Sequence, residues 1–203
     1  MTDPITIPAE AVRLLREETG AGMMDCKRAL VEAGGDVDRA REILRERGQA
    51  SFRKRAGRQA SEGVIDAYIH GEGRIGVLVE VNCETDFVAR TPEFRRLARE
   101  VAMQVAARDP RWIARDDVPA DVTAGEGKIY EEQARATGKP DKVIDRIVEG
   151  KLEAFFKETV LLDQDYIRED SKTVGELVGE MAAKVGENIV VRRFARFRVG
   201  EET

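Results

Sequence analysis

Apolar residues recur every three to four positions through the first 48 residues, a spacing that predicts three short amphipathic helices. The first begins at Pro8, which suits the first position of a helix, and a glycine-rich bend follows it. The second runs from about Met24 to a glycine pair, and the third begins after Asp36, a favourable N-cap, and ends at Gly48. We therefore expect a small three-helix bundle at the start of the chain.

From residue 62 the apolar period changes to two, which predicts extended strands. Alternating segments at 65–69 and 75–83 flank the sequence GEG, so together they predict a β-hairpin. Thr91 and Pro92 then form the signal for a helix N-terminus. The helix that follows has one apolar face, made of Phe94, Leu97, Ala98, Val101 and Val105. We expect this helix to lie on the sheet.

Beyond the hairpin and its helix, the pattern predicts a loop and then two paired helices. Residues 109–125 contain two prolines and several acids, which favour a loop. Helical spacing follows at 126–137 and at 141–158, with the breaker sequence GKP between them. We expect a helical hairpin near 126–158.

The C-terminal residues predict one more helix and one more strand. Thr173 and Glu176 form a capping box, which marks the start of a helix. Residues 188–199 alternate like a strand. One face would carry Ile189, Val191, Ala195, Phe197 and Val199, and the other mainly Arg192, Arg196 and Arg198. The predicted fold class is therefore α+β, with a small antiparallel sheet of at least three strands and helices on one of its faces.

These elements predict three regions along the chain. Residues 1–50 form the helical bundle, residues 51–60 a basic linker helix, and residues 61–203 the α+β core. The linker region contains Arg53 and Lys54 within a run of basic side chains, which favours two interpretations: a nucleic-acid contact or a solvated linker. The first 60 residues carry 12 basic and 10 acidic groups, too few excess positive charges for a broad phosphate-binding face. We favour the solvated linker, with Arg55 and Arg58 included, and expect no direct contact with nucleic acid.

Composition and charge indicate a folded chain without covalent crosslinks. Its 203 residues carry 34 basic and 39 acidic side chains, and the apolar fraction of 42% is near that of globular proteins. No signal peptide or membrane span is apparent at the N-terminus or elsewhere in the sequence. Cys26 and Cys83 lie too far apart in sequence for a Cys-x-x-Cys pair. We expect a cytoplasmic protein that does not contact membranes.

The sequence also offers little for covalent catalysis. The only histidine, His70, stands beside a predicted hairpin turn, where we expect it to be exposed. Neither a phosphate-binding loop nor a dinucleotide fingerprint is present. We therefore expect no cofactor, no metal site and no enzymatic activity.

Two segments resist a purely structural interpretation. Met23 and Met24 stand in a glycine-rich bend, where flexible apolar side chains suit an adaptable contact with a partner, although one of them could equally fill the small bundle. Phe87 and Val88 stand in a polar connection between the hairpin and the next helix. An exposed phenylalanine there would be a typical binding anchor, whereas considered alone Phe87 is more easily interpreted as a core residue.

Three segments together resemble bacterial elongation factor Ts. They are TGAGMMDCK at 19–27, EVNCETDFVAR at 80–90 and VGENI at 185–189, in the order found in that family. The resemblance extends over essentially the whole chain. It implies that the N-terminal module is a three-helix, ubiquitin-associated-like bundle and that an α+β core follows.

The resemblance also implies a function. Members of this family are guanine nucleotide exchange factors for elongation factor Tu in translation elongation. Asp86 and Phe87 would form the tip that enters the GTPase and disturbs its magnesium and phosphate site, with Thr85 and Val88 in the same segment. A second contact, which docks the bundle on the GTPase, would be made by Met23, Met24 and Asp25.

The single core of this chain is similar to that of the short family members, which need two chains to present two cores. The resemblance therefore implies a homodimer, with residues 61–203 as the dimerisation domain. A small sheet with exposed edges and one uncovered face agrees with this expectation. Without the resemblance, a binding module that holds a peptide or a ubiquitin-like fold, and has no exchange activity, remains the alternative.

Overall fold

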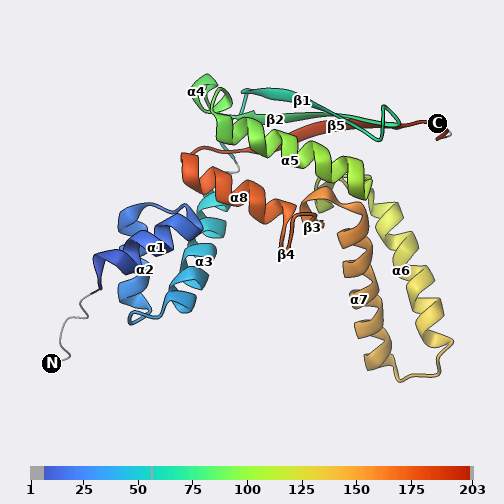
Figure 1. The fold of residues 1–203 in the computed structure, drawn as a ribbon. Helices are drawn as coiled ribbons and strands as arrows, with labels where there is room; N and C mark the ends of the chain where they lie inside the picture. The colour runs from blue at the N-terminus through green and yellow to red at the C-terminus, as the bar shows by residue number, and fades with distance from the viewer. Residues whose placement is uncertain (1–6, 56, 202–203) are drawn as a thin grey trace. The chain divides into compact units, whose positions relative to one another are not determined.

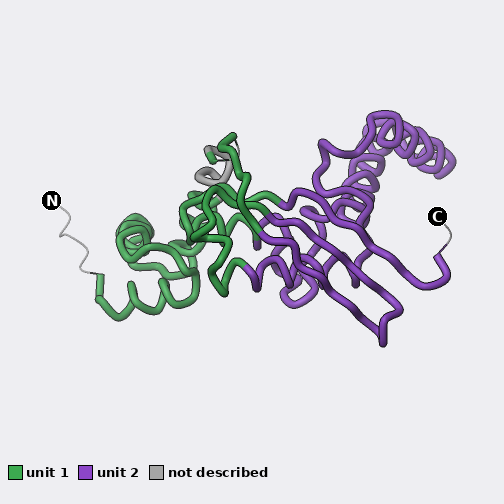
Figure 2. The backbone as a smooth tube through the Cα atoms, turned by 90° about the horizontal axis from the view of Figure 1, so that it is seen from above, with its two compact units in different colours: residues 1–63, 82–94, 178–190 green, residues 64–81, 95–177, 191–203 purple. Residues whose placement is uncertain are grey.

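The computed structural model of the protein describes residues 7–55 and 57–201, and it divides into two compact units (Figure 2). Unit 1 contains the described residues up to Gly63 together with Asn82–Phe94 and Val178–Val190. Unit 2 contains Val64–Val81, Arg95–Leu177 and the described residues from Val191 onward. Each unit thus gathers segments that are far apart in the sequence, and the three predicted regions remain predictions.

The N-terminal bundle of unit 1 has the three predicted helices, α1 (Ala9–Thr19), α2 (Met23–Glu32) and α3 (Val37–Arg55) (Figure 1). Their apolar faces meet in one core made of Val12, Leu15, Cys26, Ala29, Leu30, Ala40 and Ile43. Asp36 caps α3 as predicted, because its Oδ1 accepts a hydrogen bond from the N–H of Arg39 at 3.0 Å.

Two helix boundaries in the bundle differ from the prediction. Pro8 is the N-cap of α1, one position before the helix begins. The expected end of the third helix at Gly48 is wrong, because α3 continues to Arg55. A glycine inside a helix costs only about 1 kcal/mol, and the Arg, Glu, Gln and Ala residues around it favour helix. The side chains of Arg53 and Lys54 lie outside the described residues, so the two interpretations of the basic linker remain as they were.

A three-stranded sheet with strand order β1-β2-β5 forms the predicted α+β core. Its strands are β1 (Glu62–His70), β2 (Ile75–Cys83) and β5 (Val190–Arg198). The N–H of Val199 donates to the carbonyl of Arg74 at 2.9 Å, and Arg193 pairs with Glu80 at 2.6 Å. Residue numbers thus rise along one strand as they fall along the other, so β2 and β5 are antiparallel. The tight turn between β1 and β2 confirms the predicted hairpin.

Helix α5 (Pro92–Arg108) covers one face of this sheet (Figure 1). Thr91 caps it as predicted, since its Oγ1 accepts from the N–H of Phe94 at 3.3 Å. Arg99 of α5 lies 4.8 Å over the ring of Tyr68 on β1, which fixes the side of the sheet on which the helix lies. The predicted apolar face of α5 is buried together with Val77, Val79 and Val81 of β2.

The opposite face of the sheet is apolar and exposed. It carries Ile65 and Ile69 from β1, Leu78 from β2, Phe197 from β5, and Val199 just beyond β5. Phe197 is 70% exposed and Ile65 is 66% exposed. The prediction of one apolar face for the last strand is therefore only partly right, because Ile189 and Val191 are buried whereas Ala195, Phe197 and Val199 are exposed.

Unit 2 also contains the helical hairpin, α6 (Ala120–Arg135) and α7 (Asp141–Thr159). The prediction of a loop as far as residue 125 is wrong, because α6 begins at Ala120, directly after Pro119 as its N-cap. Gly125 and Gly127 lie within this helix, and their low helix propensity makes the helix hard to recognise in the sequence. Arg115, in the 3-10 turn Arg115–Asp117, forms ion pairs with Glu153 of α7 at 2.6 Å and with Asp163 at 3.0 Å. These pairs join the segment before α6 to the C-terminal end of α7.

A two-stranded ribbon precedes the last helix and was not predicted. Its strands, β3 (Asp165–Tyr166) and β4 (Glu169–Thr173), are short and polar and follow the 3-10 turn Leu161–Asp163. Helix α8 (Val174–Val185) then begins with the predicted capping box: Glu176 accepts from the N–H of Thr173 at 3.0 Å, and Thr173 accepts from the N–H of Glu176 at 3.1 Å. No helix among the described residues is long and apolar enough to span a membrane.

Candidate partner-binding site

The segment around Phe87 is a short helix rather than a loop. Residues 84–91, here called the α4 turn, contain the four-residue helix α4 (Asp86–Ala89) and join β2 to α5. Thr85 is its N-cap, and its Oγ1 accepts from the N–H of Val88 at 3.4 Å. Thr91 closes the turn, because its hydroxyl donates to the carbonyl of Val88 at 2.8 Å while it caps α5. Two successive N-caps therefore define the backbone of the whole turn.

The α4 turn presents Phe87 to solvent. The side chain is 79% exposed, so the interpretation of Phe87 as a core residue is wrong. Ala89 faces inward instead and is buried, Val88 is half-buried, and Asp86 pairs with Arg90 at 2.8 Å. The turn thus holds one large aromatic side chain outside the unit on a backbone that is hydrogen-bonded on both sides.

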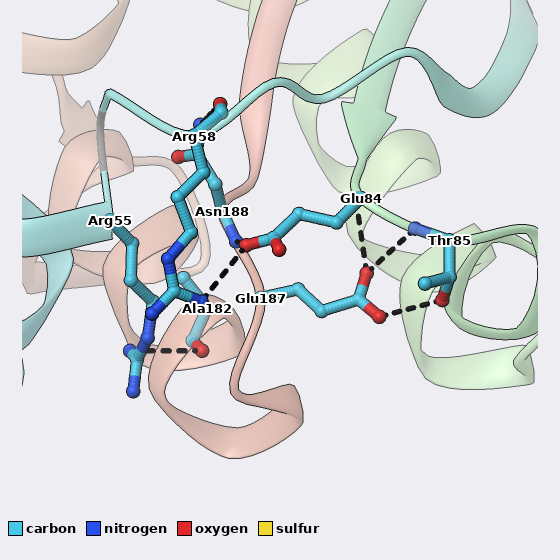
Figure 3. A network of polar contacts seen from close by, with 7 residues as sticks. All are labelled: Arg55, Arg58, Glu84, Thr85, Ala182, Glu187 and Asn188. Carbon is cyan, nitrogen blue, oxygen red and sulfur yellow. Dashed lines mark hydrogen bonds and ion pairs between the residues drawn. The ribbon is translucent and has the colours of Figure 1, made fainter.

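A polar network fixes the N-terminal end of this turn, and its centre is Glu187 (Figure 3). One carboxylate oxygen of Glu187 accepts from the N–H of Glu84 at 3.0 Å and from the N–H of Thr85 at 3.1 Å. The other oxygen accepts from the hydroxyl of Thr85 at 2.6 Å. The carboxylate therefore satisfies three donors of two successive residues, from a position more than 100 residues away in the sequence.

Asn188 extends the network to the segment that follows α3. Its N–H donates to a carboxylate oxygen of Glu84 at 2.6 Å, and its side-chain amide donates to the carbonyl of Arg58 at 2.8 Å. Arg58 in turn lies 3.4 Å from the same carboxylate of Glu84. Arg55 donates to the carbonyl of Ala182 in α8 at 3.4 Å. Three segments of unit 1 therefore meet beside the α4 turn (Figure 3).

Sequence reasoning assigned no role to Glu187, Asn188 or Glu84. The signal that could have indicated one is Gly186, which ends α8 with a φ of 79°, in the left-handed region that glycine adopts without strain. A glycine stop followed by two polar residues and then a strand places those residues in a tight connection, where their side chains are free to bond elsewhere. Their partners could not be found from local pattern because they are distant in sequence.

The predicted docking corner of the bundle is also exposed. Met23 and Met24 are 46% and 61% exposed, so neither of them fills the core of the bundle. Gly20, with a φ of 67°, ends α1, and the N-cap Gly22 begins α2 two residues later. Asp25 in the first turn of α2 pairs with Arg28. The α4 turn and this corner both belong to unit 1.

The two cysteines and the histidine are held by contacts within the chain. Both cysteines are buried and free. Burial raises the pKa of Cys83 to about 11, so its thiol keeps its proton at neutral pH and donates to the carbonyl of Thr85 at 3.2 Å. His70 is exposed as predicted and is hydrogen-bonded through Nδ1 to the hydroxyl of Tyr68 at 3.0 Å.

This arrangement is typical of an α+β binding protein, because apolar side chains project from turns whose backbone is fixed by hydrogen bonds. Among the described residues, no group of three or more His, Cys, Asp and Glu side chains could hold a metal ion. Comparison with known protein families gives a match to Elongation factor TS over residues 38–201. The chain belongs to the elongation factor Ts family, and its role lies in translation elongation.

Curated relatives match nearly the whole chain. The elongation factor Ts of Caldanaerobacter subterraneus subsp. tengcongensis is 62% identical over 195 residues, which cover 96% of this chain and 98% of the relative. The elongation factor Ts of Thermoanaerobacter sp. strain X514 is 60% identical, with 96% of each chain covered. That of Coprothermobacter proteolyticus is 56% identical and covered over 99% of its length.

Proposed function

We propose that the protein is a guanine nucleotide exchange factor for elongation factor Tu, acting in the cytoplasm. The observation that carries the proposal is Phe87, a phenylalanine that is 79% exposed within a hydrogen-bonded turn. An aromatic side chain held outward in this way can enter a partner without a prior rearrangement of its own backbone.

The exchange mechanism follows from linked binding. Phe87, with Asp86 beside it and Thr85 and Val88 in the same turn, enters the GTPase and displaces the groups that hold magnesium and phosphate. Burying the ring contributes about 1.5 to 3 kcal/mol, enough to weaken GDP binding by one to two orders of magnitude. Linkage makes the effect reciprocal, so bound GDP lowers the affinity of the exchange factor for elongation factor Tu to the same extent. No covalent bond forms or breaks, so the function requires no enzymatic group and no cofactor.

The second contact supplies affinity. Met23 and Met24 add adaptable apolar area, and Asp25 adds a charge at the same corner of the bundle. Such a contact holds the protein on the GTPase in both the nucleotide-bound and the nucleotide-free states. Its loss should therefore raise the concentration needed for exchange more than it lowers the maximal rate. Neither contact involves nucleic acid.

The active form is a homodimer whose two copies pair through the exposed sheet face. The five large apolar side chains of that face all belong to unit 2, and an apolar surface of this kind on a three-stranded sheet marks an interface. A twofold arrangement would cover the same face of both copies at once and would present two α4 turns.

The experiment that tests the exchange function is stopped-flow release of fluorescent GDP from elongation factor Tu. Wild type should accelerate release, whereas Phe87→Ala at the same concentration should accelerate it at least tenfold less. Circular dichroism would check that the variant is folded. If wild type bound elongation factor Tu without accelerating release, the protein would be a binding module and the proposed function would be wrong.

A further inference from the structure

We infer that Glu187 is the positioning residue that holds Phe87 in its projecting orientation. The inference deepens the proposed exchange function and rests on it for the role of Phe87. Glu187 does not itself reach solvent-exposed Phe87; it acts through Glu84 and Thr85, the two residues that precede α4. On this inference, the segment that follows α8 contributes to nucleotide exchange by orienting Phe87, although it is not one of the proposed contacts with the GTPase.

Helix α4 cannot fix its own orientation. It has four residues, fewer than the length at which an isolated helix becomes stable in water, and only Ala89 among them is buried. Its direction must therefore come from the hydrogen bonds on either side of it, which Thr91 makes at the C-terminal end and the network around Glu187 makes at the N-terminal end. Phe87 lies two residues after Thr85, so any rotation about the bonds of Thr85 swings the ring directly.

Thr85 is held by each of its polar groups. Its N–H and its hydroxyl donate to the two oxygens of Glu187, at 3.1 and 2.6 Å. Its carbonyl accepts from the thiol of Cys83 at 3.2 Å and from the N–H of Ala89 at 3.3 Å. Because the hydroxyl donates to Glu187, its lone pairs remain available to the N–H of Val88. The carboxylate thus sets the direction of the hydroxyl that caps α4.

Glu187 is itself rigidly placed. Before it, Gly186 turns the chain sharply at the end of α8. After it, Asn188 is 1% exposed and is hydrogen-bonded to Glu84 and to the carbonyl of Arg58. A carboxylate between two such anchors loses little further freedom when it accepts three hydrogen bonds. Hydrogen bonds to an ionised acceptor are stronger than those to a neutral one, which suits a residue that must resist the force on an inserted ring.

The test is a double-mutant cycle on GDP release from elongation factor Tu, with wild type, Glu187→Ala, Phe87→Ala and the double variant at matched concentrations. Glu187→Ala should slow release about tenfold relative to wild type. The double variant should match Phe87→Ala within about twofold, because Glu187 acts only through that ring. Glu187→Gln should retain most of the activity, since its amide oxygen still accepts from both N–H groups. Additive effects of the two alanine substitutions would overturn the inference.

A second measurement separates this inference from the proposed function. Hydrogen exchange of the Glu84 and Thr85 amides should become at least tenfold faster in Glu187→Ala and remain slow in Phe87→Ala. Glu176→Ala is the matched control, because it removes a carboxylate that likewise accepts from the N–H of a helix N-cap, Thr173, and it should leave GDP release unchanged. Unchanged amide protection in Glu187→Ala would overturn the positioning role. If Phe87→Ala alone failed to slow release, the exchange function would be wrong, while the amide measurement would still show whether Glu187 holds the turn.

Discussion

Phe197→Ala should dissociate the proposed homodimer without unfolding the chain. Phe197 is 70% exposed on the free face of the sheet, so its ring makes few contacts within its own subunit. Fully burying a phenylalanine contributes about 1.5 to 3 kcal/mol, which leaves about 1 to 2 kcal/mol for the exposed part of this ring. A twofold interface buries the ring in both copies, so the loss per dimer is about 2 to 4 kcal/mol. The dimer dissociation constant should therefore rise about 30- to 1000-fold.

Sedimentation equilibrium over a range of concentrations measures this change directly. Phe87→Ala is the matched control, because it removes the same ring from a similarly exposed position outside the sheet and should leave the dissociation constant unchanged. Circular dichroism should report the same helix and strand content for both variants. A wild-type protein that stays monomeric at tens of micromolar, or a Phe197→Ala dimer as tight as wild type, would refute the pairing through this face.

Two further predictions concern stability. Phe94→Ala should lower the free energy of unfolding by about 3 to 5 kcal/mol, because its ring is buried. Phe87→Ala should change it by less than about 0.5 kcal/mol, because its ring is exposed. Urea titrations measure both changes, and equal losses for the two variants would contradict this reasoning. The pKa of Cys83 is about 11 in the folded chain against an ordinary 9.0, so the thiol stabilises the fold below pH 9 and this contribution is lost as the pH rises toward 11. The difference in unfolding free energy between wild type and Cys83→Ala should therefore narrow from pH 8 to pH 10, and a constant difference would rule out the linkage.

The elements that the sequence predicts well are those that local chemistry specifies. The hairpin, α5 and α8 each combine a clear apolar period with a turn or a capping residue, and Thr91 and Thr173 cap as expected. The start of α6 was predicted six residues too late because Gly125 and Gly127 disguise a helix that packing supports. The ribbon of β3 and β4 has only two and five residues, too few for an alternating pattern to be recognised.

The candidate site divides in the same way. The unusual positions of Met23 and Phe87 are visible in the sequence because large apolar side chains stand among polar and turn residues. Their exposure depends on packing, and so the sequence alone leaves a core position open for each. The contact between Glu187 and Thr85 joins residues 102 positions apart. Both residues lie in segments that resemble elongation factor Ts, but nothing in the sequence indicates that the two segments touch. Polar contacts between residues so far apart in the sequence can be recognised only once the fold is known.

The exposure of these side chains has a common physical cause in their place within a helix. Side chains in an α-helix point toward its N-terminus, so a residue in the first turn projects past the end of the helix, where no preceding turn exists for it to cover. Met23 and Met24 begin α2, and Phe87 is the second residue of α4. A large apolar residue at such a position can be replaced without opening a cavity, whereas replacing Thr85 would remove the hydrogen bond that caps α4. In the proposed mechanism, partner binding falls to residues of the first turn and their orientation to the cap. Glu187, which is bound to the cap of α4, would in this way control a ring that it does not touch.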